Sequence, residues 1–271
     1  MTPYYSRDGI EIYCGDCLEV MPQLEPPFDA IITDLPYGTT ACEWDSIIPL
    51  EKLWKEYRRL IKWGGAIVLN SSQPFTTILI NSNLKWFKYE LIWEKNRLTN
   101  FYNTDFQPGK SHESIEVFSS GAASYSPNGN NMTFNPQLEP GAPWKKKDIS
   151  SGRHTYHAPK KQIERVNDGY RYPRSVLSFA CEFEYHPTQK PVAMMSYLIR
   201  TYTNPGELIL DNTMGSGTTL VAAQNEGRRA VGIEISEEYC RIAVDRLRQP
   251  SFFSLPTVKQ AAVGATQAEL M

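Results

Sequence analysis

The chain has 271 residues, of which 41% are hydrophobic and 21% charged, a composition typical of globular proteins and not of disordered or fibrous ones. This length accommodates one α/β domain with a large insertion. The net charge of −2 argues against nucleic-acid binding through overall charge. No window approaches the roughly 18 apolar residues of a membrane span, and the first residues lack the apolar run of a signal peptide. We therefore expect a cytoplasmic protein with no membrane partner.

Five cysteines do not form a disulfide framework in a chain of this size, which favours a reducing compartment. Cys14 and Cys17 make a single C-x-x-C pair, with no second pair and no His nearby. We interpret this pair as a chance spacing and expect no metal site.

The first part of the chain alternates predicted strands and helices. Short apolar or alternating runs predict strands over residues 9–13, 28–33, 66–69, 89–93 and 114–118. Apolar residues spaced three and four apart predict helices over 18–24, 49–62 and 75–80. The alternation indicates an α/β fold.

The pattern stops between residues 119 and 184, where Gly, Pro, Asn and Ser are dense. Order resumes with a helix at 192–202, a strand at 207–210, a helix at 218–226, a strand at 230–233 and a helix at 237–247. We therefore predict one domain over 1–248 with 119–184 as an insertion, followed by a loosely held tail over 249–271.

A glycine-containing turn, Asp211 to Thr219, lies between a predicted strand and a predicted helix, where nucleotide-like ligands approach the backbone of α/β sheets. Glu234 ends the next predicted strand and is placed to accept hydrogen bonds from a ribose diol. The third glycine of the dehydrogenase fingerprint is missing, because Leu220 occupies its position. This argues against a nicotinamide cofactor.

A second motif, Asp34-Leu35-Pro36-Tyr37, directly follows the predicted strand 28–33. Methyl transfer to an exocyclic amine of a base requires localisation of a nitrogen lone pair that is delocalised into the ring. The Asp34 carboxylate and the backbone carbonyl of Leu35 or Pro36 can accept the amino hydrogens and favour a tetrahedral nitrogen. The aromatic face of Tyr37 suits stacking on a base rotated out of a duplex. Asp34, Leu35, Pro36 and Tyr37 are the predicted catalytic residues.

Both motifs, with the run His186-Pro187-Thr188-Gln189-Lys190-Pro191, resemble the DNA amino-methyltransferases, which modify adenine N6 or cytosine N4. The motif order is that of the β group, with the tetrapeptide first, the target-recognition segment second and the cofactor turn last. The resemblance covers residues 9–248. It implies a class I S-adenosylmethionine-dependent methyltransferase, which is an α/β, Rossmann-like fold with a mixed seven-stranded sheet, circularly permuted, with 119–184 as target-recognition insertion.

The resemblance also implies roles in binding S-adenosylmethionine. Asp16 and the Cys17 backbone would meet its adenine, Glu234 its ribose, the loop 213–217 its methionine portion, and Thr188 and Lys190 its carboxylate. The implied cofactor-binding residues are Asp16, Cys17, Asp34, Thr188, Lys190, Asp211, Thr213, Gly215, Ser216, Gly217, Thr218, Glu234 and Ile235. The family usually has Asp-Pro-Phe where this chain has Asp211-Asn212-Thr213, so an aromatic contact expected at Thr213 is missing.

Positive charge gathers in the insertion, where residues 141–175 contain nine Lys or Arg against three Asp or Glu. This segment is the predicted contact for double-stranded DNA, with a solvated basic loop as the alternative. The predicted DNA-binding residues are Lys145, Lys146, Lys147, Arg153, Lys160, Lys161 and Arg165. A homodimer and a cognate restriction enzyme are left open as further partners.

The favoured function is site-specific methylation of adenine N6 in double-stranded DNA, because the motif begins with Asp as in adenine-modifying members. An N4-cytosine methyltransferase and a catalytically inactive DNA-binding protein of the same fold are the alternatives. Carbon-5 cytosine methylation is excluded chemically, because its cysteine nucleophile typically follows a proline and no cysteine here does. We interpret His112-Glu113 as structural.

Overall fold

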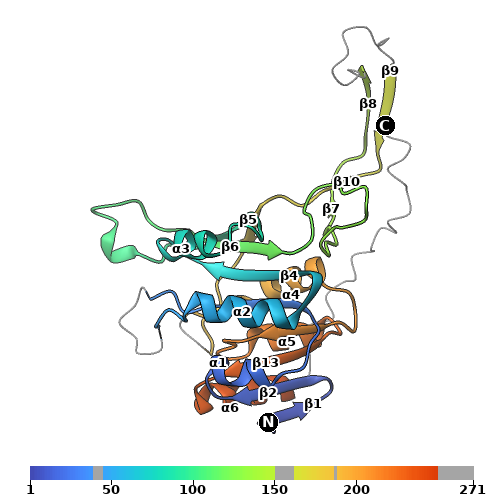
Figure 1. The fold of residues 1–271 in the computed structure, drawn as a ribbon. Coiled ribbons are helices and arrows are strands. Elements are labelled where there is room, and N and C mark those ends of the chain that lie inside the picture. Colours follow the sequence, from blue (N-terminus) through green and yellow to red (C-terminus); the bar gives the residue numbers. More distant parts are fainter. Residues whose placement is uncertain (39–44, 150–161, 186–187, 250–271) are drawn as a thin grey trace. The chain divides into compact units, whose positions relative to one another are not determined.

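The computed structural model describes residues 1–38, 45–149, 162–185 and 188–249 (Figure 1). These residues divide into two compact units. The sheet unit comprises residues 1–135 and 175–249, and the hairpin unit comprises residues 136–149 and 162–174. Within these described ranges, no helix is long and apolar enough to cross a membrane.

The sheet unit alternates strands and helices, as the sequence predicts. Its strands are β1 (Tyr5–Arg7), β2 (Ile10–Cys14), β3 (Phe28–Asp34), β4 (Ile61–Ser71), β5 (Phe87–Lys95), β6 (His112–Ser119), β11 (Val176–Phe179), β12 (Leu208–Asp211) and β13 (Arg229–Glu234). Its helices are α1 (Cys17–Val20), α2 (Leu50–Leu60), α3 (Phe75–Ser82), α4 (Val192–Tyr202), α5 (Thr218–Asn225) and α6 (Glu237–Arg248), with 3₁₀ turns η1 (Met21–Gln23) and η2 (Phe101–Asn103). Helix α2 ends two residues before its predicted end, because Ile61 already pairs with Phe28 as a strand residue.

All these strands form one mixed sheet in the order β1-β2-β13-β12-β3-β4-β6-β5-β11. It has nine strands and not the seven expected, since the edge strand β1 pairs antiparallel with β2 and β11 pairs parallel with β5. Both extra strands are short. Strand β1 pairs with the adjacent β2, whereas β11 pairs with β5, which lies far from it in the chain, so a local sequence pattern does not reveal β11. Strands β2, β13, β12, β3 and β4 run parallel, which places their carboxyl ends at one edge of the sheet.

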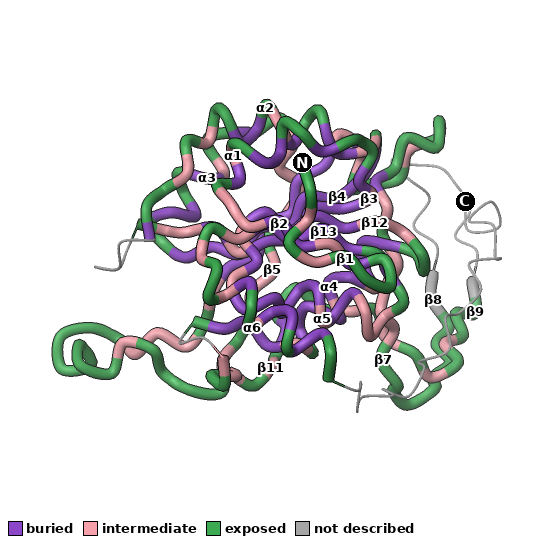
Figure 2. The backbone as a smooth tube through the Cα atoms, turned by 90° about the horizontal axis from the view of Figure 1, so that it is seen from below, coloured by how far each residue is buried: buried purple, intermediate pink, exposed green. Residues whose placement is uncertain are grey.

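Helices cover both faces of the sheet, with α4, α5 and α6 on one face and α1, α2 and α3 on the other (Figure 2). Residues of β3 alternate between the faces: Ala30 and Ile32 pack with α4 to α6, whereas Ile31 packs with α2. Because successive strand side chains point to opposite faces, a strand buried on both sides needs a continuous apolar run. The motif residues that follow such runs are therefore held by a rigid core.

The hairpin unit consists of two antiparallel pairs. Strand β7 (Glu139–Pro140) pairs with β10 (Tyr170–Arg171), and β8 (Trp144–Ile149) pairs with β9 (Gln162–Asn167). The insertion predicted over 119–184 is thus divided in the structure. Residues 119–135 and 175–184 belong to the sheet unit, because Met132 is buried in its core and β11 extends its sheet.

One buried carboxyl group makes folding stability depend on pH. Glu116 of β6 is fully buried opposite Glu90 of β5. Burial and the Glu90 charge raise the pKa of Glu116 to about 7 from 4.5, although a hydrogen bond from Ser71 lowers it. The folded state therefore holds a proton that the unfolded chain releases above pH 4.5.

We expect the free energy of unfolding to fall as pH rises from 4.5 to 7, and Glu116→Gln to remove about 1–3 kcal/mol of this dependence. Urea denaturation at a series of pH values measures it. Glu94→Gln, at an exposed position on β5, is the matched control and should keep the wild-type dependence. An unchanged dependence in Glu116→Gln would contradict the assignment.

Candidate active site

The predicted catalytic carboxylate lies at the carboxyl end of β3, next to a buried lysine. The Tyr37 hydroxyl donates to Asp34 Oδ1 at 2.6 Å, and Lys190 Nζ donates to Asp34 Oδ2 at 2.5 Å. The Asp34 side chain remains 29% exposed, whereas that of Lys190 is only 7% exposed. Asp34 is thus held in place on both oxygens yet open to an incoming group.

The rest of the tetrapeptide is fixed by neighbouring residues. Asp45 Oδ1 accepts hydrogen bonds from the backbone N–H groups of Tyr37, at 2.8 Å, and Gly38, at 2.9 Å. Leu35 is buried and Pro36 is half-buried. The Tyr37 ring stacks on Phe75 with centroids 5.5 Å apart, so an aromatic pair borders the carboxylate.

A chain of charges extends from Asp34 into the sheet. Lys190 Nζ lies 3.3 Å from Glu113 Oε2, and Lys95 forms an ion pair with Glu113. Burial opposes the charge of Lys190, but Asp34 and Glu113 outweigh it and raise the lysine pKa above its usual value. Burial likewise opposes the charge of Glu113, but Lys190 and Lys95 outweigh it and lower the pKa of this carboxyl. Lys190 is therefore a cation at neutral pH.

The predicted cofactor turn begins at Asp211, at the end of β12. Asp211 is buried, and its Oδ1 accepts from the Thr33 hydroxyl at 2.7 Å and from the Thr213 N–H at 3.2 Å. Burial raises the Asp211 pKa to about 6 from 3.8, although the hydrogen bonds lower it. The structure thus places Asp211 as a support for the turn. The next residue, Asn212, accepts from the buried Tyr57 hydroxyl at 2.6 Å.

Thr213, which stands where the family usually has an aromatic residue, connects the two motifs. Its Oγ1 lies 2.8 Å from Thr33 Oγ1 and donates to the Asp34 backbone carbonyl at 3.0 Å. A phenylalanine has no such donor. In this chain the position contributes a hydrogen bond that fixes the Asp34 backbone to the predicted cofactor turn.

We expect Thr213→Val to lower kcat about tenfold, because the isosteric change removes one hydrogen bond to the Asp34 carbonyl. Thr213→Ser, which keeps the hydroxyl, should remain within about twofold of wild type. Steady-state kinetics measures both, and equal effects of the two variants would contradict a role for the hydroxyl.

Glu234, at the end of β13, lies beside the same turn. Its two oxygens accept from the N–H groups of Gly215, at 2.9 Å, and Ser236, at 2.8 Å. Each carboxylate oxygen keeps a second lone pair, which a ribose hydroxyl can use. The following side chain, Ile235, is 66% exposed and offers an apolar surface. An acceptor beside an apolar surface fits an adenosine group.

The remaining predicted cofactor residues have different environments. Gly217 has φ +79°, and a Cβ there would lie 2.6 Å from the Ala243 Cβ, so this position requires glycine. Arg246 Nη1 donates to the hydroxyls of Ser216 and Thr218, both at 3.0 Å, so these two groups support the turn.

The end of β2 adjoins the Glu234 strand, as the Gly15 N–H donates to the Glu234 carbonyl at 2.9 Å. Asp16 caps α1 by accepting from the Leu18 N–H at 2.7 Å, and it is exposed, whereas Cys17 is buried. Thr188 is exposed, and His186 and Pro187 lie outside the described residues.

The family model described as DNA methylase matches residues 28–245, which include both motifs. The chain belongs to this DNA methylase family. The methylase is 26% identical to DNA adenine methyltransferase YhdJ of Escherichia coli over 280 residues, covering 96% of this chain and 91% of that protein. It is 25% identical to the type II methyltransferase M2.DpnII of Streptococcus pneumoniae over 270 residues, covering 90% and 92% of the two chains.

Solved structures resemble the methylase along most of its length. The M1.HpyAVI–SAM complex has 26% sequence identity and a TM-score of 0.58, covering 88% of this chain and 100% of that chain. PvuII DNA methyltransferase, described as cytosine-N4-specific, has 16% identity and a TM-score of 0.65, and the match covers 93% of this chain and 90% of that chain. The second likeness shows a shared fold.

Four of the predicted DNA-binding residues of the methylase are described, and all four lie on one hairpin. Lys145, Lys146 and Lys147 belong to β8 and Arg165 to β9, with Lys146 paired opposite Arg165. All four are exposed. Arg153, Lys160 and Lys161 lie outside the described residues.

Several residues of the candidate site were not predicted as site residues from the sequence. Glu113 was interpreted as structural, and its ion pair with Lys190 is compatible with that interpretation. Phe75, Asp45 and Lys95 were not singled out. Lys95 lies just after the predicted strand 89–93, and Glu113 lies just before the predicted strand 114–118. Their positions next to strand ends could have pointed to both residues. Asp45 and Phe75 lie in loop and helix segments that carried no comparable signal.

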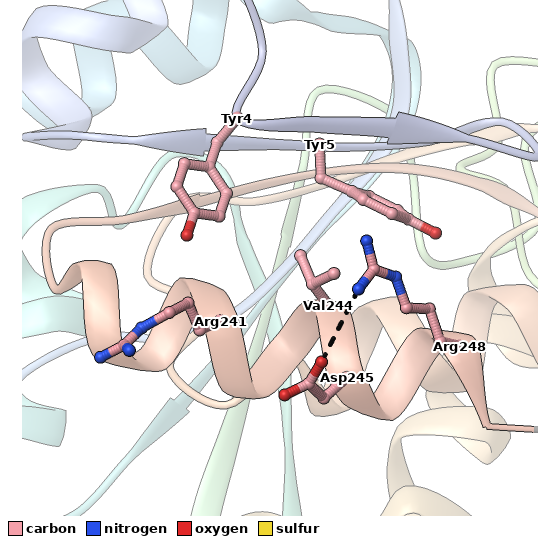
Figure 3. A pocket seen from close by; sticks show the side chains of 6 residues that line it. All are labelled: Tyr4, Tyr5, Arg241, Val244, Asp245 and Arg248. Atoms are coloured by element: carbon pink, nitrogen blue, oxygen red, sulfur yellow. Dashed lines mark ion pairs between the residues drawn. The ribbon is translucent and has the colours of Figure 1, made fainter.

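A separate hollow in the methylase lies between β1 and α6 (Figure 3). It is lined by Tyr4, Tyr5, Arg241, Val244, Asp245 and Arg248, none of which was predicted for catalysis or cofactor binding. Three strands, β2, β13 and β12, separate β1 from β3 in the sheet, so this hollow is not the candidate active site. Elsewhere in the described ranges, no three His, Cys, Asp or Glu side chains are grouped to hold a metal ion.

Proposed function

We propose that the methylase transfers a methyl group from S-adenosylmethionine to adenine N6 at specific sites in double-stranded DNA. The observation that carries the proposal is the Thr213 hydrogen bond to the Asp34 carbonyl, at 3.0 Å. This bond supports the proposal because it holds the backbone of the proposed catalytic residue next to the proposed cofactor turn. A shared site of this kind suits direct transfer between two bound molecules.

The chemistry at Asp34 follows from its hydrogen-bond capacity. When bound, S-adenosylmethionine supplies an electrophilic methyl group. The Asp34 carboxylate accepts an amino hydrogen of the target base, which frees the nitrogen lone pair for attack, and later receives the released proton. Lys190 neutralises and orients the carboxylate, while the half-buried Tyr37, backed by the buried Phe75 ring, offers an aromatic surface for an extrahelical base.

Adenine is favoured over cytosine by two observations. The catalytic motif begins with Asp34, as in the adenine-modifying members that the chain resembles. In addition, a relative that aligns with 96% of the chain is named a DNA adenine methyltransferase.

The test incubates unmodified duplex DNA with methyl-labelled S-adenosylmethionine, digests the product and identifies the labelled nucleoside. N6-methyladenine is expected. Labelled N4-methylcytosine would reject adenine as the target and show that the protein is an N4-cytosine methyltransferase. DNA binding without any labelled nucleoside would favour an inactive DNA-binding protein. Modified-base sequencing of the product gives the target site.

The β8–β9 hairpin is the proposed contact with the DNA backbone. Strand periodicity places Lys145 and Lys147 on one face, and Lys146 and Arg165 on the other, so both faces carry cations. Such cations interact with phosphates without reading sequence.

We expect the combined Lys145→Ala, Lys146→Ala and Lys147→Ala variant to reduce the slope of log affinity against log salt concentration by about 2–3. Fluorescence anisotropy with a labelled duplex measures this slope. The control replaces Lys52, Lys55 and Lys85, which are exposed on the sheet unit, by alanine. An equal loss in both variants would mean that the hairpin is not the contact.

A further inference from the structure

Three aromatic side chains between β5 and β6 project away from the core. We call residues 96–111 the aromatic loop. Phe101 is 72% exposed, Tyr102 96% and Phe106 88%. Tyr102 and Phe106 are the two most exposed large hydrophobic side chains in the part of the chain that the structure describes. Exposed apolar groups gathered in this way commonly mark an interaction site.

The aromatic loop has a defined structure of its own. At its neck the Thr99 N–H donates to the Lys110 carbonyl at 3.0 Å, and the Lys110 N–H donates to Asn100 Oδ1 at 2.5 Å. At its tip η2 places Phe101 and Tyr102 side by side, with ring centroids 6.3 Å apart. The chain extends beyond α3 in this region (Figure 1). The three aromatic side chains are therefore held on a structured loop, and they do not contribute to the hydrophobic core.

The neck of the aromatic loop adjoins the catalytic site on both sides. Lys95 and Glu113, which flank the loop, form an ion pair, and Glu113 lies 3.3 Å from Lys190, the partner of Asp34. On the other side, Lys110 Nζ donates to the Ser72 hydroxyl, three residues before the Phe75 ring that stacks on Tyr37. The loop thus projects from the rim of the site where the target base is held.

The charge of this segment favours a nucleic acid as its partner. Within the aromatic loop, the exposed Arg97 and the half-buried Lys110 stand against the single acid Asp105. In proteins that bind nucleic acids, Lys and Arg side chains contact phosphates, and aromatic side chains between them stack on bases. In addition, rotating a base out of a duplex leaves a gap of one base, and an inserted apolar side chain offsets the lost stacking.

We propose that the aromatic loop enters the duplex beside the rotated base and that Tyr102 occupies the gap in the base stack. This inference rests on the proposed function, because it assigns the loop to the same base-rotating reaction. Phe101 and Phe106 flank the insertion and pack against neighbouring bases.

The first experiment does not depend on catalysis. Tyr102 is replaced by the photoreactive p-benzoylphenylalanine, and the protein is irradiated with labelled duplex DNA. The matched control places the same group at Tyr125, which is 66% exposed outside the loop. Crosslinks to DNA bases from position 102, and few from position 125, are expected. No DNA crosslink from position 102, or crosslinks only to another protein chain, would overturn the loop proposal.

The second experiment measures methylation of a duplex carrying the site identified in the product assay. The combined Phe101→Ser, Tyr102→Ser and Phe106→Ser variant should lose about 10- to 100-fold in kcat/KM, as expected when base–aromatic stacking is lost. Its affinity for S-adenosylmethionine should remain within about twofold, and Tyr125→Ser should behave as wild type. A duplex with a mismatched target base, which costs less to open, should restore most of the activity.

The outcomes separate the two proposals. Crosslinking to DNA by a protein that methylates neither base would support the loop contact and reject the proposed function. Full activity of the triple serine variant would overturn the loop proposal while the methyltransferase activity stands.

Discussion

Asp34→Asn is expected to reduce methyl transfer at least about 1,000-fold while S-adenosylmethionine still binds. The amide keeps the size of the side chain but loses the charge that draws an amino hydrogen away from the base. It also places an N–H₂ group where Oδ1 or Oδ2 now accepts from Tyr37 and Lys190. The substitution therefore removes the acceptor on which the proposed chemistry depends.

Single-turnover assays with labelled methyl donor measure the chemical step, and calorimetry measures cofactor binding in the same preparation. Asp245→Asn, at a position whose side chain is 74% exposed on α6, controls for loss of a surface carboxylate. Retained activity in Asp34→Asn would reject Asp34 as the acceptor. Loss of cofactor binding as well would mean that Asp34 also contributes to the cofactor site, directly or through the bond from Thr213 to its backbone.

Glu234→Gln is expected to weaken S-adenosylmethionine binding about 10- to 100-fold, the effect of losing a charged hydrogen-bond acceptor. In glutamine an N–H₂ group replaces one carboxylate oxygen. This group must face the N–H of either Gly215 or Ser236, so one of the two hydrogen bonds is lost because two donors meet. Burial raises the pKa of Glu234, although backbone hydrogen bonds lower it. Wild-type affinity should accordingly weaken in acid, as protonation removes the acceptor.

Calorimetric titration at several pH values measures this affinity. The control is Glu238→Gln, an exposed carboxylate in the first turn of α6. Unchanged affinity in Glu234→Gln would show that the ribose is held elsewhere. Because the Asp34 and Glu234 variants should affect different quantities, one kcat and the other cofactor affinity, the pair tests the division of the site into catalytic and cofactor parts.

Much of the fold could be predicted because its elements carry strong local patterns. Buried parallel strands need continuous apolar runs, and α2 needs a stripe of residues such as Leu53 and Tyr57 on one side. The hairpin unit lacked such a signal. Its strands β8 and β9 are held by pairing with each other and expose charged side chains, so neither burial nor alternation identifies them.

The candidate site was predicted in its motifs but not in its contacts. The positions of Asp34, Asp211 and Glu234 at strand ends follow from the sequence, and parallel strands gather such ends at one edge. Lys190 was assigned to the cofactor through the resemblance, and the structure shows it hydrogen-bonded to Asp34 and near Glu113.

By itself, the sequence determined the α/β class, the order of the two motifs and the chemistry that Asp34 can perform, because these depend on local periodicity and residue type. Only the tertiary structure decided that Lys190 pairs with Asp34, that Thr213 holds the Asp34 backbone, and that β11 joins the sheet beside β5. Lys190 and Asp34 are 156 positions apart in the chain. Such contacts depend on which strands become neighbours in the sheet, and no local pattern encodes that choice.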